Sequence, residues 1–438
     1  MTPKTESHAP WTVDEMRNTL VRGTAGFACE PIPMSEATSW RVADGAISHV
    51  SGGYFSVVGA APREPRQQPL VLLFQPQSAF NGLLTATIDG ELHLLLQARV
   101  EPGNIGVAQY GPTVQSTPAN YLRVHGGRAT PYLEYFHRCS TGPTVVGDWS
   151  ELDLGGRYLF KNKRLVCLEL AERPPLEDNF VWVPASVIKQ AVRESALMNT
   201  DLRSLLAVMP WGQWPTRDDD SDLSRAAHDS LRAPVRPDTV GRVVTEVGRP
   251  PVPSKLVPLS DLPNWELTAY GLFEREPVQG FDVQFYRVEA PTREVSHWTQ
   301  PLLNSRTAGK VVLALTVCDG TMRALVQVRS EPGLSTGAAV FPSHLVLPGE
   351  VQAGEDRGVY ERLVASSSAT LARTRESDEG GRFYQDESDF EVLLVDDAEA
   401  FGEGFLWLTL SELKCLLARS NLCSLQMRCI ASMLLWLL

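Results

Sequence analysis

The chain has 438 residues, of which 43% are hydrophobic and 21% charged, and its formal net charge is −12. This length exceeds what one ordinary hydrophobic core supports, and the composition is that of a globular protein, so we expect two domains. The acidic balance argues against a nucleic-acid partner or an anionic membrane surface, although it leaves room for a small anion in a local basic pocket.

Cysteine usage and the two ends of the chain indicate where the protein works. The seven cysteines include no CxxC pair, which predicts a thiol-reduced, cytoplasmic protein with neither a disulfide framework nor a zinc site. The N-terminal MTPKTESHAPW lacks the apolar core of a signal peptide. The apolar C-terminal IASMLLWLL is too short to span a membrane, so we expect a buried helix end or a helix at a subunit contact.

The expected elements of the first half follow an N-terminal extension at residues 1–29. The run GLLTATIDGELHLLLQARV (82–100) predicts two strands joined by an Asp-Gly turn. The apolar run RLVCLEL (164–170) indicates a buried strand, and the apolar spacing of SALMNTDLRSLLAVM (195–209) predicts a helix. Strands therefore precede a closing helix.

The second half begins after a charged, Pro-rich stretch at 214–256, which we expect to be a linker with a short helix at 222–233. FEVLLVDD (390–397) then indicates a buried strand. The chain closes with the helical spacing of SNLCSLQMRCIASMLLWLL (420–438). This order of elements resembles that of the first half.

Both halves in fact carry the same motifs in the same order. IPMSEATSW ends at Trp40 and VPLSDLPNW ends at Trp265, 225 residues later. Other matched positions are Asp89 with Asp319, Glu101 with Glu331, Gly155 with Gly380, Trp182 with Trp407, and Arg203 with Arg428. The repeat predicts a tandem duplication of one α+β domain, with helices packed on a mixed sheet, at residues 30–213 and 257–438.

One segment is not repeated. EPGNIGVAQYGPTVQSTPANYLRVHGG (101–127) is rich in neutral hydrogen-bonding side chains, and nothing in the second half matches its part from Gln115 to Gly127. A duplication preserves packing in both units, whereas a site can survive in only one. We therefore expect this segment to belong to a binding or catalytic site.

Several motifs together resemble the NDP-hexose 2,3-dehydratase family. They are ISHVSGGYFSVVGA, QARVEPGN, PTVQSTPANYLRVHGG, REVSHWTQPL and DEGGRFY, and the likeness runs from about Trp40 to Arg428. The resemblance implies tandem Nudix-like domains and a homodimer. It also implies a lyase of deoxysugar biosynthesis for glycosylated natural products such as antibiotics.

The activity that the resemblance implies is removal of the C2 hydroxyl of an NDP-4-keto-6-deoxyhexose, typically dTDP-4-keto-6-deoxyglucose, as water. The product is a 3,4-diketo-2,6-dideoxy sugar nucleotide. A separate NAD(P)H-dependent 3-ketoreductase then traps this unstable product, so the partners implied are the dTDP-sugar and that reductase.

The chain departs from the family pattern at three places. ELDLG (151–155) stands where the family carries Gln-Ser-Glu-Gln-Gly, and KNKRL (161–165) where it carries Lys-Arg-Asn-Arg-Asn. In the second half PSHL (342–345) takes the place of PTVQ, while SDEGGRFY is retained. These departures motivate an alternative hypothesis, a catalytically altered nucleotide-sugar-binding paralogue that assists another enzyme.

The implied elimination defines which groups a site must contain. The C4 ketone acidifies the C3 proton, so a base must remove that proton, a donor must stabilise the enolate oxygen, and an acid must protonate the departing hydroxyl. No redox change occurs and the ketone is already present, so we expect neither a nicotinamide nor a metal. The sequence has no GxGxxG fingerprint after a strand and no HExxH or Nudix-type Glu cluster.

The candidate residues were chosen by these requirements. Our candidate catalytic residues are His125, Tyr121 and Glu379. Our candidate substrate-binding residues are Arg99, Glu101, Asn104, Thr113, Gln115, Thr117, Asn120, Arg123, Arg157, Lys161, Arg382 and Tyr384. His125 is the first choice for base or acid because imidazole titrates near neutral pH.

Alternatives remain for several of these residues. Arg123 or Arg99 can pair with the pyrophosphate, and Tyr121 or Tyr110 can stack on the base or donate to the enolate. The repeated Glu-Pro-Gly motif at Glu101 can equally be a turn. A Nudix-type diphosphohydrolase is disfavoured because the metal-binding Glu helix is missing.

Overall fold

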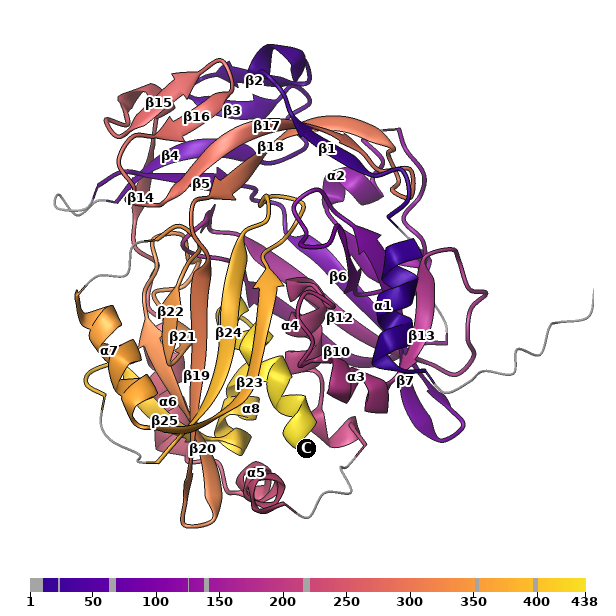
Figure 1. The fold of residues 1–438 in the computed structure, drawn as a ribbon, viewed down its shortest axis with the longest axis vertical. Coiled ribbons are helices and arrows are strands. Elements are labelled where there is room, and N and C mark those ends of the chain that lie inside the picture. The colour runs from indigo at the N-terminus through magenta and orange to yellow at the C-terminus, as the bar shows by residue number, and fades with distance from the viewer. Residues whose placement is uncertain are drawn as a thin grey trace, which may run out of the picture.

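The computed structural model describes residues 11–22, 24–62, 68–124, 126–137, 142–215, 221–350, 354–396 and 401–438 (Figure 1). Two large sheets and two smaller sheets form an α+β fold, as expected, with the smaller sheets at one end of the molecule. The helices are α1 (Val13–Arg22), α2 (Pro118–Tyr121), α3 (Ala185–Ala191), α4 (Thr200–Val208), α5 (Asp222–Arg232), α6 (Pro237–Val247), α7 (Gly354–Ala365), α8 (Leu410–Leu417) and α9 (Leu425–Ser432).

The first large sheet has seven strands in the order β10-β12-β6-β7-β13, with β8 paired to β7 and β9 to β6. The predicted hairpin is confirmed, because Asp89 and Gly90 turn between β6 and β7 with φ angles of 51° and 85°. β12 runs parallel to β6, so the sheet is mixed. Its strands are β6 (Ala79–Ile88), β7 (Glu91–Val100), β8 (Ala108–Gly111), β9 (Val114–Ser116), β10 (Thr144–Leu152), β12 (Asn162–Leu170) and β13 (Phe180–Pro184).

The second large sheet has the same strand order as the first. Its path is β23-β24-β19-β20-β25, with β21 paired to β20, β22 paired to β19, and β24 parallel to β19. The strands are β19 (Gly309–Cys318), β20 (Thr321–Arg329), β21 (Ala339–Pro342), β22 (His344–Val346), β23 (Ser367–Ser377), β24 (Glu387–Val395) and β25 (Phe405–Thr409). Equivalent positions of the two halves can therefore be compared strand by strand.

The two small sheets each combine strands from both halves of the chain. β1 pairs with β17, and β14 pairs with β4. One sheet contains β2 (Trp40–Ala43), β3 (Ala46–His49), β4 (Ser56–Pro62), β5 (Leu70–Phe74), β11 (Tyr158–Leu159) and β14 (Ser254–Val257). The other contains β1 (Ala28–Pro31), β15 (Trp265–Thr268), β16 (Gly271–Glu274), β17 (Phe281–Glu289) and β18 (His297–Ser305).

This strand exchange gives ordered structure to the expected extension and linker. Residues 1–29 include α1 and the start of β1, and residues 214–256 include α5, α6 and most of β14. The helix predicted at 222–233 is observed as α5. Its N-cap Ser221 accepts a hydrogen bond from the backbone N–H of Ser224.

Two buried salt bridges join the two halves of the chain. Helices α4 and α9 pack against each other. Arg203 on α4 lies 2.7 Å from Glu376 of the second half, and Arg428 on α9 lies 3.3 Å from Glu151 of the first half. All four side chains are buried, so each half supplies the counter-charge for a buried arginine of the other.

The backbones of the repeated Glu-Pro-Gly and Gly-Gly-Arg motifs also meet across the halves. The N–H of Gly103 donates to the carbonyl of Gly380 at 2.8 Å, and that of Gly333 donates to Gly155 at 2.9 Å. A Cβ added to Gly103 would lie 1.5 Å from the Phe383 carbonyl oxygen, so this approach requires glycine. The contact between Gly103 and Gly380 holds the segment that begins at Glu379 against the first half of the chain.

The apolar C-terminus is buried within the chain itself. Leu434, Leu435 and Leu437 are at most 1% exposed. A buried helix end was one of the two expectations for this segment. In the described part of the chain, no helix is long and apolar enough to cross a membrane.

Candidate active site

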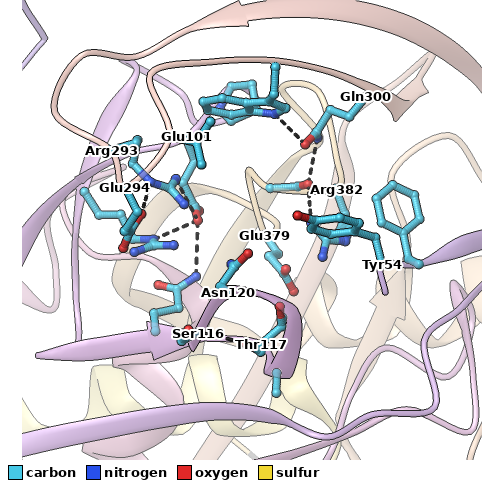
Figure 2. A pocket seen from close by; sticks show the side chains of 18 of the residues that line it. Tyr54, Glu101, Ser116, Thr117, Asn120, Arg293, Glu294, Gln300, Glu379 and Arg382 are labelled. Atoms are coloured by element: carbon cyan, nitrogen blue, oxygen red, sulfur yellow. Dashed lines mark hydrogen bonds and ion pairs between the residues drawn. The ribbon is translucent and has the colours of Figure 1, made fainter. Parts of the chain in front are cut away.

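A cavity of about 180 Å³ lies between the first large sheet and the small sheets (Figure 2). The large sheet contributes Asn81 from β6, Gln115 from β9 and Lys163 from β12. The other walls come from α2, α4, β2, β3, β18 and the segment 379–382 of the second half. Strands of both halves therefore build one site.

A cluster of buried charges lies at the floor of this cavity. Lys163 Nζ lies 2.8 Å from Asp201 Oδ1, 3.0 Å from Glu379 Oε2 and 3.5 Å from Asp153 Oδ2. Lys161 Nζ lies 3.2 Å from Asp153 and 3.5 Å from Glu379. Glu379, 11% exposed, is the most accessible side chain of the cluster.

Burial and charge set the protonation states of this cluster. Burial raises the pKa of Glu379, but the cations Lys161, Lys163 and Arg382 outweigh it and hold that pKa well below its usual range. Burial likewise opposes the charge of Lys163, yet Asp153, Asp201 and Glu379 keep its pKa well above the usual value. At neutral pH Glu379 is therefore a carboxylate and Lys163 an ammonium.

A second charged group lies at another wall. The Arg99 Nε donates to Glu101 Oε1 at 2.9 Å, and Gln115 Nε2 donates to the same oxygen at 3.3 Å. Arg293 lies 3.2 Å from Glu294, and these two residues with Glu101 are labelled in Figure 2. Burial alone would raise the pKa of Glu294, but the charges of Arg293 and Arg99 outweigh burial and lower that pKa to about 2. Both arginines are thus neutralised by carboxylates.

Aromatic rings line a further part of the cavity. The His49 ring lies 4.5 Å from Tyr54 and 5.4 Å from Trp40, measured between centroids. Trp298 Nε1 donates to Gln300, whose amide donates in turn to the Gly381 carbonyl at 2.9 Å. Such a wall suits a planar base or the apolar face of a sugar.

Arg382 differs from the other cations of the cavity. Its guanidinium lies 4.4 Å from the centroid of the Phe55 ring, and it donates to the Gly381 carbonyl and, at 3.4 Å, to Gln75. Among the described residues it has no carboxylate within ion-pair distance. It is therefore the cation whose charge is most available to an anionic ligand.

The structure brings many of the predicted site residues together. The predicted residues that line the cavity are Arg99, Glu101, Gln115, Thr117, Asn120, Glu379 and Arg382. Lys161 lies behind Glu379, with its Nζ 3.9 Å from the centre of the Tyr158 ring. The first-half segment and the retained motif of the second half thus face one cavity.

Other predicted residues lie elsewhere. Arg123 is exposed and Tyr121 half-buried, and neither lines the cavity. Thr113 is buried and bonds the backbone of Leu84 and Leu95. His125 lies outside the described residues.

The remaining predicted residues make structural contacts. Arg157 donates to backbone carbonyls, including that of Pro348, and lies over the Phe281 ring at 4.8 Å. Tyr384 stacks on Tyr286 at 4.5 Å between centroids. Asn104 is buried against Gly380. Tyr110 donates to the Met16 carbonyl, and burial raises its pKa to about 12.

Sequence reasoning missed Asn81, Lys163 and Asp201, although a signal for them exists. The equivalent positions in the second half are Val311, Ser388 and Gln426. The signal is that each is a polar residue within a matched strand or helix whose counterpart in the other half has a different character.

Comparison with known proteins shows the family. The family model described as NDP-hexose 2,3-dehydratase matches residues 18–209 and 245–434. The chain belongs to the NDP-hexose 2,3-dehydratase family. The resemblance read from the motifs is thereby confirmed, and the activity of the family is a carbon–oxygen lyase reaction on a nucleotide sugar.

Three relatives carry the name dTDP-4-dehydro-6-deoxy-alpha-D-glucopyranose 2,3-dehydratase. The protein from Streptomyces violaceoruber is 32% identical over 87% of this chain and 87% of its own. Those from Saccharopolyspora spinosa and Amycolatopsis orientalis are each 28% identical, over 100% and 94% of this chain and 93% and 86% of theirs. A solved structure of an ADP compounds hydrolase is 13% identical in sequence, with a TM-score of 0.20. The match covers 35% of this chain and 80% of the hydrolase, and we draw no conclusion about the fold from it.

Proposed function

We propose that this dehydratase eliminates water across C2 and C3 of dTDP-4-keto-6-deoxyglucose, the substrate named for its relatives. The observation that carries the proposal is the position of Glu379, an ionised carboxylate 3.0 Å from the Lys163 ammonium in the cavity. A carboxylate beside a cation is the pair needed to remove a proton next to a ketone and to stabilise the enolate that forms.

Glu379 is the proposed proton carrier. In the gluco configuration the C3 hydrogen and the C2 hydroxyl lie on the same face of the ring, so one group can serve both. Glu379 takes the C3 proton and then gives it to the departing C2 hydroxyl, which leaves as water. The enol left at C2–C3 takes a proton from solvent at C2 and loses the proton of its C3 hydroxyl, which gives the C3 ketone.

The charges around Glu379 suit the second of these steps. Lys161 and Lys163 lower the pKa of Glu379, which makes the carboxylate a weak base but makes its protonated form a strong acid. The first step then depends on a donor that acidifies the C3 proton by binding the C4 oxygen. Lys163 remains an ammonium because three carboxylates raise its pKa. As Glu379 takes the proton and loses its charge, the Lys163 N–H that faced it turns to the developing charge on the C4 oxygen.

Arg382 and the aromatic rings are the proposed nucleotide-binding groups. Arg382 has no carboxylate partner among the described residues, so its guanidinium is available to the pyrophosphate. Tyr54 and His49 are placed to contact the thymine. Thr117 and Asn120 remain the proposed contacts of the sugar hydroxyls, whereas the Gln115 amide is already bonded to Glu101 and Asn199.

The finer architecture expected from the sequence belongs to the same proposal. We infer that each half is a Nudix-like repeat that arose by tandem duplication. The shared strand order of the two large sheets supports this, as do the two ranges matched by the family model. The exchanged strands favour units that begin at α1 and α6 rather than at residues 30 and 257.

A homodimer, a downstream 3-ketoreductase and a cytoplasmic location complete the proposal. The free cysteines among the described residues support a reducing compartment. The buried C-terminus removes one argument for the dimer, because its leucines are already covered by their own chain. A catalytically altered paralogue is the less favoured alternative, because Asp153 within ELDLG and Lys161 within KNKRL keep the acid and the lysine of the family runs and pair with each other in the charge cluster.

Replacing Glu379 by Gln tests the proposal. We expect kcat to fall by roughly 10² or more, because an amide cannot accept the C3 proton, while binding of dTDP persists. Water elimination is measured with reduction of the product by a 3-ketoreductase and NADPH.

The matched control is Glu387→Gln, at the start of β24 in the same half of the chain. Glu387 pairs with Arg375 at 3.4 Å and does not line the cavity, so its variant should keep wild-type kcat. Undiminished turnover in a folded Glu379→Gln enzyme would remove Glu379 from the mechanism.

A further inference from the structure

Asn81 on β6 is a lining residue of the cavity whose side chain makes no hydrogen bond within the part of the chain that the structure describes. Its side chain is 1% exposed and lines the cavity. Neither its amide nitrogen nor its amide oxygen has a hydrogen-bond partner among the described residues. A buried amide that makes no hydrogen bond destabilises the fold. Asn104 has an equally unpartnered amide but does not line the cavity, so the position of Asn81 in the cavity wall is what indicates a group that bonds a ligand.

The neighbouring amide of Gln115 shows the opposite situation. Gln115 faces Asn81 across the β6–β9 pair. Its Nε2 donates to Glu101 at 3.3 Å and its Oε1 accepts from Asn199 at 2.8 Å. Gln115 is thus fixed by the protein, whereas both the donor and the acceptor of Asn81 remain available.

The second large sheet shows that the fold does not require an amide here. Val311 occupies the equivalent position on β19, opposite Leu345 on β22 and Phe390 on β24. All three are buried in the apolar core. Asn81 is therefore a polar residue at a strand position that the same fold fills with valine.

The position of Asn81 also indicates which part of a ligand it meets. Lys163 is opposite Ala79, two residues before Asn81 on the same face of β6. Lys163 in turn contacts Glu379 at 3.0 Å. Asn81 thus lies beside the pair proposed to carry out the elimination.

We propose that Asn81 binds the C3–C4 edge of the keto sugar, an inference that rests on the proposed function. Its amide N–H donates to the C4 oxygen, and its amide oxygen accepts from the C3 hydroxyl. A vicinal hydroxyketone offers one donor and one acceptor side by side, which matches the two atoms of an amide. Asn81 and Lys163 together form the oxyanion site for the enolate.

The proposed role of Asn81 predicts how kcat and KM should change when its amide is lost. The C4 oxygen gains negative charge as the C3 proton leaves, so the Asn81 hydrogen bond strengthens in the transition state. Loss of the amide should lower kcat more than it raises KM. Binding of dTDP alone, which has no sugar ring beyond the deoxyribose, should not change.

The test uses Asn81→Val, which installs the residue of the second sheet, and Asn81→Asp, which keeps the size but loses the donor. Kinetic constants, dTDP binding by calorimetry and the melting temperature of the ligand-free protein are measured. We expect kcat to fall roughly 10²-fold in both variants. In Asn81→Val the melting temperature should rise by about 1–3 °C, because an unpartnered buried amide is removed.

Thr85→Val is the matched control on the same face of the same strand. Thr85 is 1% exposed, but its hydroxyl donates to the Leu168 carbonyl at 3.1 Å. Its loss should lower the melting temperature and leave kcat unchanged. The two valine variants should therefore move stability in opposite directions.

Two results would overturn the role of Asn81 while wild-type turnover stands. One is kcat in Asn81→Val within about threefold of wild type. The other is a melting temperature lowered as in Thr85→Val, or failure of that variant to fold, since either means that the amide has a structural partner. Absence of turnover in the wild type would instead count against the proposed function itself.

Discussion

At the scale of single residues, the site depends on which charges are compensated and which are not. Arg99 and Arg293 lie against Glu101 and Glu294. Arg382 lies over an aromatic ring, without a carboxylate partner among the described residues. We therefore propose that Arg382 binds the pyrophosphate, and not Arg123, which is exposed outside the cavity.

Arg382→Ala tests this assignment. A contact with pyrophosphate is shared by the ground and transition states, so its loss should raise KM by roughly 10-fold or more with a smaller change in kcat. Steady-state kinetics with the dTDP-sugar measure both constants, and Arg123→Ala is the matched control. A raised KM in Arg123→Ala together with a normal KM in Arg382→Ala would reverse the assignment.

Seven of the residues proposed from the sequence line the candidate cavity. Gln115 belongs to the unrepeated segment and Glu379 to the retained motif SDEGGRFY, and both patterns can be recognised from the sequence alone. Lys163 and Asp201 were missed because a charged residue inside a strand or helix is expected to be exposed to solvent until the structure shows that it is buried. Their 2.8 Å contact depends on the packing of α4 on β12, which the sequence does not encode locally.

At the scale of elements, helices α4 and α9 hold the two halves together through equivalent buried arginines. Arg203 reaches Glu376 at 2.7 Å, and both side chains are at most 2% exposed. An unpaired charge in this position is costly because little water reaches it. Breaking this ion pair therefore destabilises the contact between the halves on which the position of Glu379 depends.

Arg203→Met should lower the free energy of unfolding by about 3–5 kcal/mol, because it leaves Glu376 buried without a counter-charge. The double variant with Glu376→Gln should recover most of that loss, and urea denaturation measures both. Arg164→Met, which breaks an exposed pair with Asp148, should cost less than about 1 kcal/mol. Equal effects of the buried and exposed substitutions would contradict this account.

At the scale of the whole molecule, the repeat predicted two equivalent sheets but not how they exchange strands. The hairpin at Asp89 and helix α5 follow local signals, so the sequence predicts them well. The pairing of β1 with β17 and of β14 with β4 joins residues that are 192 or more positions apart, and it has no local signature. Short β-strands with mixed polarity fit many partners, so only the packed structure selects one.

The consequence is a division of labour between the halves. The first large sheet provides the polar floor of the cavity. The second half provides Glu379 and Arg382 from the connection between β23 and β24, and its own large sheet is apolar around Val311. We therefore expect one productive site per chain. It contains residues of both halves, so neither half should be active alone.

The most direct test of this account is incubation of the protein with dTDP-4-keto-6-deoxyglucose in D₂O, followed by NMR and by reduction of the product with a 3-ketoreductase and NADPH. We predict loss of one water per molecule, deuterium at C2 of the product, and NADPH consumption that depends on this protein. Recovery of unchanged substrate, or cleavage of its diphosphate with the C2 hydroxyl intact, would contradict the central claim.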